Sequence, residues 1–349
     1  MTSDANIRRA ISRVADGNDL DEQGAAAVMD ELMSGDATPA QFAAFVTALR
    51  MKGESIGEIT GMARVMRERC SPVAVDGPLL DTCGTGGDAT GSFNVSTCAA
   101  FIAAGAGARV AKHGNRAMTS QCGSADVLEA LGAKIDLTAD QVARCIEDAG
   151  VGFMFAQSFH PAMKHVGPAR REIGIRTVFN LLGPITNPAG ATRRVLGVPR
   201  PELVEVLATV LGRLGVERAY VVHGDDGFDE VSITGPTTIA QLTEGGVSMM
   251  RLAPEDAGLS RHDVAHLRGG TPEQNANEMR LVLEGAEGPL RDFSLINAAV
   301  ALMAWGAADD IASGVQLAAK SMDSGAAAAK LTAFVQATQA VANQSSTAS

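Results

Sequence analysis

The sequence predicts an α/β protein, with a small N-terminal all-helical domain ahead of a larger α/β domain whose mainly parallel central sheet is covered by helices. Up to about residue 70, apolar residues recur only at helical spacing. The rest alternates short apolar runs with helical segments, as parallel sheets require. At 349 residues the chain can hold two domains. We expect a helical domain over 1–73 and an α/β domain over 74–349.

Four helices are expected in the N-terminal part. Ile7, Ile11 and Val14 recur at helical spacing in the first. The third begins at Thr38-Pro39, a cap followed by proline at the first helical position, and ends at Gly53. The second and fourth are marked by two further sets of apolar residues, namely Ala27, Met29, Leu32 and Met33, then Ile56, Ile59, Met62 and Val65.

The remaining elements follow from the alternation after Pro72. Strands are expected at 79–83, 109–111, 151–155 and 219–222. Helices are expected at 94–104, 125–131 and 201–214, and the region from 294 to about 339 is Ala-rich and helical. Polar residues 343–349 are expected to be disordered. In such a fold ligands bind at the carboxyl ends of the strands, so the loops there are the candidate sites.

The composition excludes several classes of protein. With 29 Lys and Arg against 40 Asp and Glu, the net charge of −11 argues against a nucleic-acid or anionic-membrane binder. Neither a signal peptide nor an apolar run long enough to cross a membrane is predicted. The five cysteines are odd in number and form no C-x-x-C, so we expect free thiols that fill space in a cytoplasmic protein.

A glycine-rich loop follows the first expected strand, over 81–88. Glycines let the backbone approach an anion, and N–H groups at a following helix start favour a phosphate there. Gly84, Gly86 and Ala89 also match dinucleotide-binding spacing. That alternative is weaker, because the helix does not open directly on the glycines and the next strand ends at Lys112-His113 instead of an acid.

Two further segments could bind an anion or a metal. Asn94-Val95-Ser96-Thr97 begins a helix, and capping needs only one of its polar side chains, so the others are available to a phosphate or a metal. The segment 112–124 has no acid and carries Lys112, His113, Arg116 and hydroxyls between glycines. A second anion cradle fits this chemistry better than a solvated turn.

Charged residues also gather after two later strands. Arg170 lies in a basic stretch from 164 to 176 and could bind a carboxylate, although it could equally be a surface residue. Four acids between 225 and 230 suit Mg²⁺, with an acidic turn as the alternative. His262 and His266 have zinc-like spacing but lack the Glu of H-E-x-x-H, so zinc is disfavoured.

Taken together, these loops closely resemble those of the anthranilate phosphoribosyltransferases, over nearly the whole chain. Several unrelated loops agree in order, which makes the resemblance specific. It rests on residues 81–88 (DTCGTGGD), 92–97 (SFNVST), 112–116 (KHGNR), 160–164 (HPAMK), 176–184 (RTVFNLLGP), Asn187-Pro188, Asp229-Glu230 and 267–270 (LRGG).

The resemblance implies transfer of the phosphoribosyl group of phosphoribosyl pyrophosphate (PRPP) to the amine of anthranilate in tryptophan biosynthesis, with Mg²⁺. It also implies a homodimer formed through the helical domain, and a segment near 165–190 packed back on that domain. Ser96, Asp229 and Glu230 would hold Mg²⁺, Asn115 and Arg170 would contact anthranilate, and His113 is the candidate base. The PRPP contacts would be Gly84, Gly87, Asp88, Ser92, Asn94, Val95, Ser96, Thr97, Lys112, His113, Gly114, Asn115, Arg116, Ala117, Met118, Thr119, Ser120 and Ser124.

A few positions depart from the family pattern. Ser92 stands where Thr is common and keeps the hydroxyl, whereas Met118-Thr119, Gln121-Cys122 and Gln157 put side-chain contacts there in doubt. Two other functions stay open. A phosphorylase-like ribosyl transferase would need no pyrophosphate and Mg²⁺ set, against which Asp229-Glu230 and Asn115 count. A nucleic-acid-binding relative should carry a basic groove, whereas this chain is acidic.

Overall fold

The computed structural model describes residues 4–87, 91–117 and 121–346. Its centre is a seven-stranded sheet of order β3-β2-β1-β4-β5-β6-β7. All pairs from β3 to β5 are parallel, while β6 and β7 are antiparallel, so the predicted mainly parallel sheet is confirmed. The strands are β1 (Leu80–Gly84), β2 (Val110–Gly114), β3 (Val151–Phe155), β4 (Arg193–Gly197), β5 (Arg218–Gly224), β6 (Thr237–Thr243) and β7 (Gly246–Leu252).

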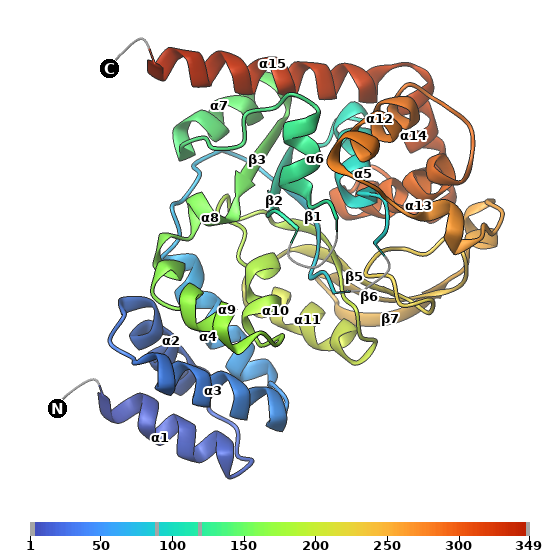
Figure 1. Cartoon of the computed structure of the whole chain (residues 1–349). Coiled ribbons are helices and arrows are strands. Elements are labelled where there is room, and N and C mark those ends of the chain that lie inside the picture. The colour runs from blue at the N-terminus through green and yellow to red at the C-terminus, as the bar shows by residue number, and fades with distance from the viewer. Residues whose placement is uncertain (1–3, 88–90, 118–120, 347–349) are drawn as a thin grey trace.

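Four helices form a separate N-terminal lobe below the sheet (Figure 1). They are α1 (Asp4–Ala15), α2 (Glu22–Ser34), α3 (Pro39–Lys52) and α4 (Ile56–Glu68). The predicted start and end of the third helix are confirmed. Thr38 and Gln41 form a reciprocal capping box, and Gly53 ends the helix with its N–H on the carbonyl of Leu49.

Helices cover both faces of the sheet (Figure 1). Successive residues of a strand point to opposite faces of the sheet. Val110 and Ala111 of β2 accordingly belong to two different buried clusters, one on each face. The remaining helices are α5 (Val95–Gly105), α6 (Ser124–Ala130), α7 (Ala139–Ala149), α8 (Ala156–Phe159), α9 (Gly167–Ile173), α10 (Phe179–Ile185), α11 (Glu202–Arg213), α12 (Pro272–Leu283), α13 (Pro289–Trp305), α14 (Ile311–Asp323) and α15 (Ala326–Ser346).

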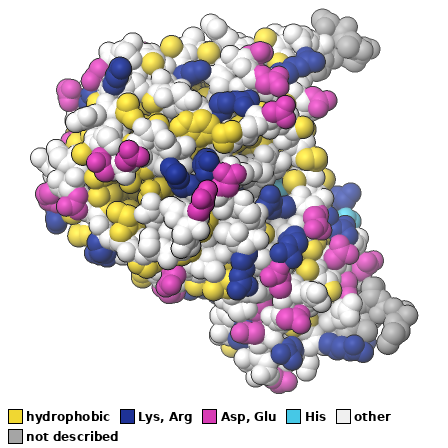
Figure 2. Space-filling view, turned by 180° about the vertical axis from the view of Figure 1, so that it is seen from behind, with side chains coloured by type: hydrophobic (Ala, Val, Ile, Leu, Met, Phe, Trp, Pro, Cys, Tyr) yellow, Lys and Arg dark blue, Asp and Glu magenta, His cyan; other side chains and the backbone are white. Residues whose placement is uncertain are grey.

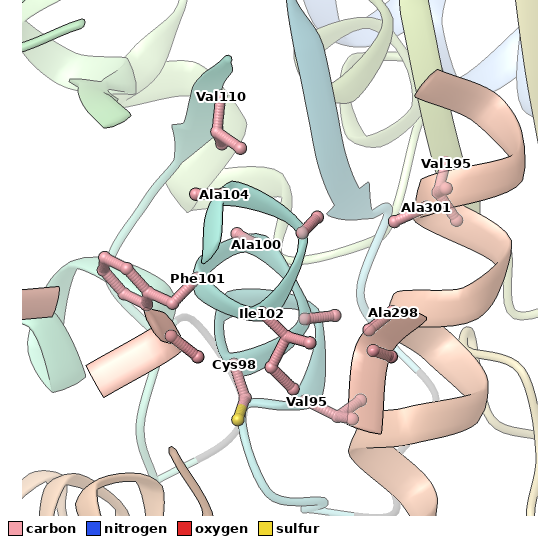
Figure 3. Close-up of a cluster of buried hydrophobic side chains, with 14 of the residues drawn as sticks. Val95, Cys98, Ala100, Phe101, Ile102, Ala104, Val110, Val195, Ala298 and Ala301 are labelled. Carbon is pink, nitrogen blue, oxygen red and sulfur yellow. The ribbon is translucent and has the colours of Figure 1, made fainter. Parts of the chain in front are cut away.

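Small side chains bring α5 and α13 close together over one face of the sheet. Ala100 and Ala104 of α5 and Ala298 and Ala301 of α13 belong to one buried cluster (Figure 3). Val195 of β4 lies in the same cluster. The alanine-rich composition is explained by this layer, since short side chains let two helices and a sheet pack closely.

The segment after β3 joins the two lobes. Phe179, at the start of α10, packs on Phe42 of α3 with ring centroids 5.4 Å apart. Leu182 and Ile185 of α10 are buried in the same cluster as residues of α2, α3 and α4. The helices that follow β3 therefore pack directly on the helical lobe.

Several elements differ from the sequence-based expectation. Strands β4, β6 and β7 and helices α7, α9, α10 and α12 were not predicted. Strand β4 begins with two arginines, an unusual start for a buried strand, and β7 has only one buried residue, Leu252, so neither shows the usual apolar pattern of a strand. The predicted disorder of 343–349 is wrong up to Ser346, because α15 extends that far over Ala-rich sequence.

No helix in the described ranges is long and apolar enough to cross a membrane. On the face drawn in Figure 2, lysines and arginines are interspersed with acids. All five cysteines are free, and four of them are buried, as expected for thiols that fill space.

Candidate active site

Four parallel strands, β1, β2, β4 and β5, end in glycine at one edge of the sheet. Gly84 of β1 is in register with Gly197 of β4, and Gly114 ends β2 on the other side of β1. The loops that follow these strands therefore begin side by side. This edge is where an open parallel sheet binds its ligands.

The glycine loop after β1 is held against an acid from the loop after β5. Gly86 donates its backbone N–H to Asp229 Oδ2 at 2.7 Å. A Cβ on Gly84 would lie 2.3 Å from the same oxygen, and one on Gly197 would lie 1.5 Å from the Asp229 carbonyl oxygen. Gly84 and Gly197 are thus required by the close approach of Asp229, and Gly87 by its φ of +89°. Predicted ligand Asp88 lies outside the described residues.

The four acids of segment 225–230 have two different roles. Asp225 accepts a hydrogen bond from Arg251 at 2.9 Å, and Asp226 accepts one from Thr234 Oγ1 at 2.5 Å. These two acids shape the turn, so the alternative of an acidic turn applies to them. Asp229, which is 7% exposed, is directed to the glycine loop instead. Glu230 is close enough to Lys112 to act on its pKa.

The start of α5 differs from the expected capping arrangement. The side chain of Asn94 makes no capping hydrogen bond. Its Nδ2 donates to the carbonyl of Cys122 at 3.1 Å, and its Oδ1 accepts from Asn275 Nδ2 at 2.8 Å. The capping prediction was therefore wrong, because Asn94 links α5 to the second loop and to α12. Val95 and Thr97 are buried at this end of α5.

Lys112 lies beneath the two loops, with only 3% of its surface exposed. Its Nζ donates to the carbonyl of Thr82 and lies 3.4 Å from Ser96 Oγ. Burial lowers its pKa, while the negative charges of Asp81 and Glu230 oppose that shift. The ammonium thus ties β1, β2 and α5 together and places a positive charge under the site.

The loop after β2 is organised by Asp126 of α6. Asp126 accepts the backbone N–H groups of Ala117 and Gly123, both at 2.9 Å, and pairs with Arg116 at 3.0 Å. Arg116 also pairs with Glu129, so its guanidinium is neutralised on α6. Predicted ligands Met118, Thr119 and Ser120 lie outside the described residues.

Asn115 is exposed at the end of the same strand. Its Oδ1 accepts the backbone N–H of Arg116 at 2.8 Å and lies 3.5 Å from Gln157 Nε2. Ser124 Oγ donates to the Asn115 carbonyl at 3.4 Å. A Cβ on Gly114 would lie 2.1 Å from that hydroxyl, so Gly114, Asn115 and Ser124 are closely packed.

His113 is packed away from solvent against His160. The ring centroids are 5.1 Å apart, and His113 is 4% exposed. Burial, and next the charge of Arg194, lower the pKa of His113 to about 3, and burial lowers that of His160 to about 3 as well. Both imidazoles are neutral at physiological pH, and this burial does not favour His113 as a base.

The segment 267–270 contacts the residues that lead from the glycine loop into α5. Phe93 donates its N–H to the Leu267 carbonyl at 2.9 Å, and Gly269 donates to the Gly91 carbonyl at 2.8 Å. Ser92 pairs with Arg268 as an isolated bridge. No role was predicted for this motif from the sequence; in the structure its contacts fix the backbone that leads into α5.

Arg170 projects from α9, on the side of the helical lobe, and is half-buried. Burial, and next the neighbouring charge of Arg176, lower its pKa. Arg176 in turn donates from Nη2 to the Thr85 carbonyl at 3.0 Å, so two arginines stand near the glycine loop. Arg176 begins the motif 176–184, but no local sequence feature placed it at the site.

A buried ion pair supports the site from below. Asp81, which is fully buried, accepts hydrogen bonds at 2.8 Å from both Arg194 Nη2 and Asn187 Nδ2. It also accepts the backbone N–H of His113 at 3.1 Å. Asp81 therefore joins β1, β2 and β4, and sequence spacing alone could not pair it with Arg194.

Comparison with known proteins identifies two families along the chain. Residues 8–70 match the family described as "Glycosyl transferase family, helical bundle domain", and residues 76–328 match "Glycosyl transferase family, a/b domain". The anthranilate phosphoribosyltransferase of Moorella thermoacetica is 58% identical over 330 residues, which cover 94% of this chain and 97% of that protein. The enzyme of the same name from Chloroflexus aggregans is 57% identical over 328 residues, covering 93% and 96%.

Solved structures agree with this comparison. The anthranilate phosphoribosyltransferase of Thermus thermophilus superposes with a TM-score of 0.90 at 45% identity, over 95% of this chain and 99% of that one. The Saccharomyces cerevisiae enzyme in complex with PRPP and Mg superposes with a TM-score of 0.88 at 29% identity, over 96% and 98%. The chain belongs to the glycosyl transferase family and, within it, to the anthranilate phosphoribosyltransferases.

Proposed function

We propose that this protein transfers the phosphoribosyl group of PRPP to the amine of anthranilate, giving N-(5-phosphoribosyl)anthranilate and pyrophosphate, in tryptophan biosynthesis. The observation that carries the proposal is the approach of Asp229 Oδ2 to the N–H of Gly86, at 2.7 Å. It brings a carboxylate to a glycine-rich loop whose backbone a ligand can approach closely. The contact lies at the edge where a parallel sheet binds its ligands. A phosphate ester with a divalent cation needs both kinds of group close together.

The phosphate groups of PRPP would bind where the loops after β1 and β2 meet α5. Glycine-rich backbone and the N-terminus of α5 offer N–H groups to an anion. Lys112 supplies positive charge from beneath, since its ammonium lies between Thr82 and Ser96. Arg116 would act at this site only by leaving its partners on α6, so its predicted contact is most simply made by its backbone.

Asp229, Glu230 and Ser96 are the residues that would hold Mg²⁺. Two adjacent carboxylates and a hydroxyl are oxygen donors of the kind that Mg²⁺ prefers, and the remaining ligands of such ions are waters and substrate phosphates. Asp229 already faces the glycine loop, so the residues present fit the ion. When bound, Mg²⁺ would neutralise the charge that develops on the departing pyrophosphate.

The acceptor would be held between the two lobes by Arg170 and Asn115. The planar guanidinium of Arg170 matches a carboxylate at two points. The exposed amide of Asn115 would orient the amine toward C1 of the ribose. An aromatic amine is already nucleophilic, so much of the rate acceleration would come from holding the two substrates in the reactive orientation. The C–N bond forms as the bond from C1 to pyrophosphate breaks, and the amine then loses a proton; we assign no base to that step.

The homodimer and the cytoplasmic location belong to the same proposal. Met51 at the end of α3 is 83% exposed, which leaves a large apolar side chain on the surface of the helical lobe. Burial of such a residue at an interface between two copies would be favourable. Light scattering at assay concentration would give the mass directly.

The fluorescence of anthranilate tests the proposed reaction. We expect it to decay when the protein, PRPP and Mg²⁺ are present together, and to stay constant after EDTA is added in excess of Mg²⁺. Arg170→Ala should raise the KM for anthranilate by about 10- to 100-fold, because a hydrogen bond to a charged group contributes about 1.5–3 kcal/mol. Absence of decay with the wild-type protein would refute the proposed reaction.

A further inference from the structure

Arg176 connects the helical lobe to the glycine loop. It lies between α9 and α10, and its Nη2 donates to the carbonyl of Thr85 at 3.0 Å. Its own carbonyl accepts a hydrogen bond from Arg50 Nη1 of α3 at 2.5 Å. One residue therefore receives a contact from the first lobe and makes a contact with the loop of the second.

The guanidinium of Arg176 also occupies the space beside Gly87. A Cβ on Gly87 would lie 2.0 Å from Arg176 Nη1 and 2.4 Å from its Cζ. Gly87 therefore has to be glycine for two reasons, namely this contact and its positive φ of +89°. The close fit means that the position of the loop tip depends on that of the Arg176 side chain.

Three hydrogen bonds, from three different parts of the fold, hold the loop at Thr85 and Gly86. Thr85 donates its N–H to the Gly197 carbonyl of β4 at 2.9 Å, and Gly86 donates to Asp229. Arg176 is the contact from the side of the helical lobe. Its position is fixed in turn, because Thr177 donates its N–H to Asn180 Oδ1 at 3.0 Å and Phe179 packs on Phe42.

We infer that Arg176 is a positioning residue for PRPP: it fixes the glycine loop in the form that binds the phosphates and makes that form depend on contact with the helical lobe. The inference rests on the proposed function of the loop. The guanidinium keeps its charge at any physiological pH, so it also adds positive potential next to an anion site. Lys112 is buried and Arg116 is paired with acids, which makes this contribution important.

The inference predicts a selective loss of affinity for PRPP. Arg176→Met keeps much of the side-chain length but removes the charge and the donors, so the KM and Kd for PRPP should rise by about tenfold or more. The KM for anthranilate should change by less than about twofold, because that site is only indirectly affected. Arg171→Met is the matched control, since Arg171 is an exposed arginine of α9, and it should behave as the wild type.

Two further measurements separate positioning from general stability. Arg176→Ala should recover affinity for PRPP when free guanidinium is added at concentrations too low to denature the protein. Arg50→Met leaves the active-site side chains intact and should raise the Kd for PRPP in the same direction, by less than the Arg176 variants. An unchanged Kd for PRPP in Arg176→Met, or an equal rise in both KM values with a fall in Tm, would overturn the inference.

Calorimetric titration of the full-length protein with PRPP and Mg²⁺ distinguishes failure of the positioning role from failure of the proposed function. If the wild type binds PRPP and Arg176→Met binds it equally well, the positioning role is refuted and the proposed function stands. If the wild type itself binds no PRPP, the proposed function is refuted, and the positioning role with it.

Discussion

Asp229 and Gly86 meet across the active-site edge of the sheet, where the carboxylate oxygen Oδ2 accepts the backbone N–H at 2.7 Å. The two residues come from loops that follow β5 and β1, which are not neighbours in the sheet. The contact therefore joins the acids of the proposed metal site to the loop of the proposed phosphate site. It also explains why β4, which lies between those two strands, ends in Gly197: Asp229 crosses over it.

A methyl group at Gly84 should disrupt this contact. The new Cβ would lie 2.3 Å from Asp229 Oδ2, so the carboxylate would have to move away from Gly86. We expect Gly84→Ala to lower kcat/KM for PRPP by at least about tenfold, or about 1.4 kcal/mol, and to raise the Mg²⁺ concentration needed for half-maximal rate. Gly235→Ala is the control, since its Cβ would have nothing within 4 Å. Equal kinetics for both variants would show that Asp229 is not needed where it lies.

The glycine loop was predictable because its signals are local. Glycines follow directly after an apolar strand, and both features lie within ten residues or so of sequence. The orientation of Asn94 was not predictable, because its partners Cys122 and Asn275 come from distant segments. The pairing of Arg116 was not predictable either. Its place in a basic loop suggested an anion site, whereas in the structure it pairs with Asp126 and Glu129 of the next helix, α6.

Strand β4 was missed for a related reason. Its first two residues are arginines, and Arg194 is buried only because Asp81, 113 residues away in sequence, neutralises it. The helical lobe, by contrast, was predicted nearly helix by helix. Its caps and apolar spacing are local features, and Thr38 caps α3 as expected.

The Asp81–Arg194 pair should be essential for stability. Removal of one partner of a buried pair leaves an uncompensated charge, so Arg194→Met should lower the free energy of unfolding by about 3–5 kcal/mol. Arg193→Met changes the neighbouring residue of the same strand, whose partner Glu217 is 55% exposed, and should cost less than about 1 kcal/mol. Urea unfolding of both variants measures the difference, and similar losses would refute the special role of Asp81.

The histidine pair should make the protein sensitive to acid. The pKa of His160 is about 3 in the folded protein, against about 6.5 for an unperturbed histidine, so the unfolded chain binds a proton first as the pH falls. Stability is then complete above about pH 6.5 and falls toward pH 3, by up to about 1.4 kcal/mol per pH unit for each such histidine. Folding free energies from urea titrations at several pH values should give a shallower slope for His160→Leu. An unchanged slope would mean that His160 titrates normally in the folded protein.

The most direct test of the account is the stoichiometry of the reaction. With Mg²⁺ and PRPP, the protein should release one pyrophosphate for each anthranilate consumed, and mass spectrometry should find one product equal to anthranilate plus a phosphoribosyl group. Pyrophosphate should not accumulate without anthranilate. Consumption of a nucleoside with inorganic phosphate, and no pyrophosphate released from PRPP, would contradict the account and indicate a phosphorylase.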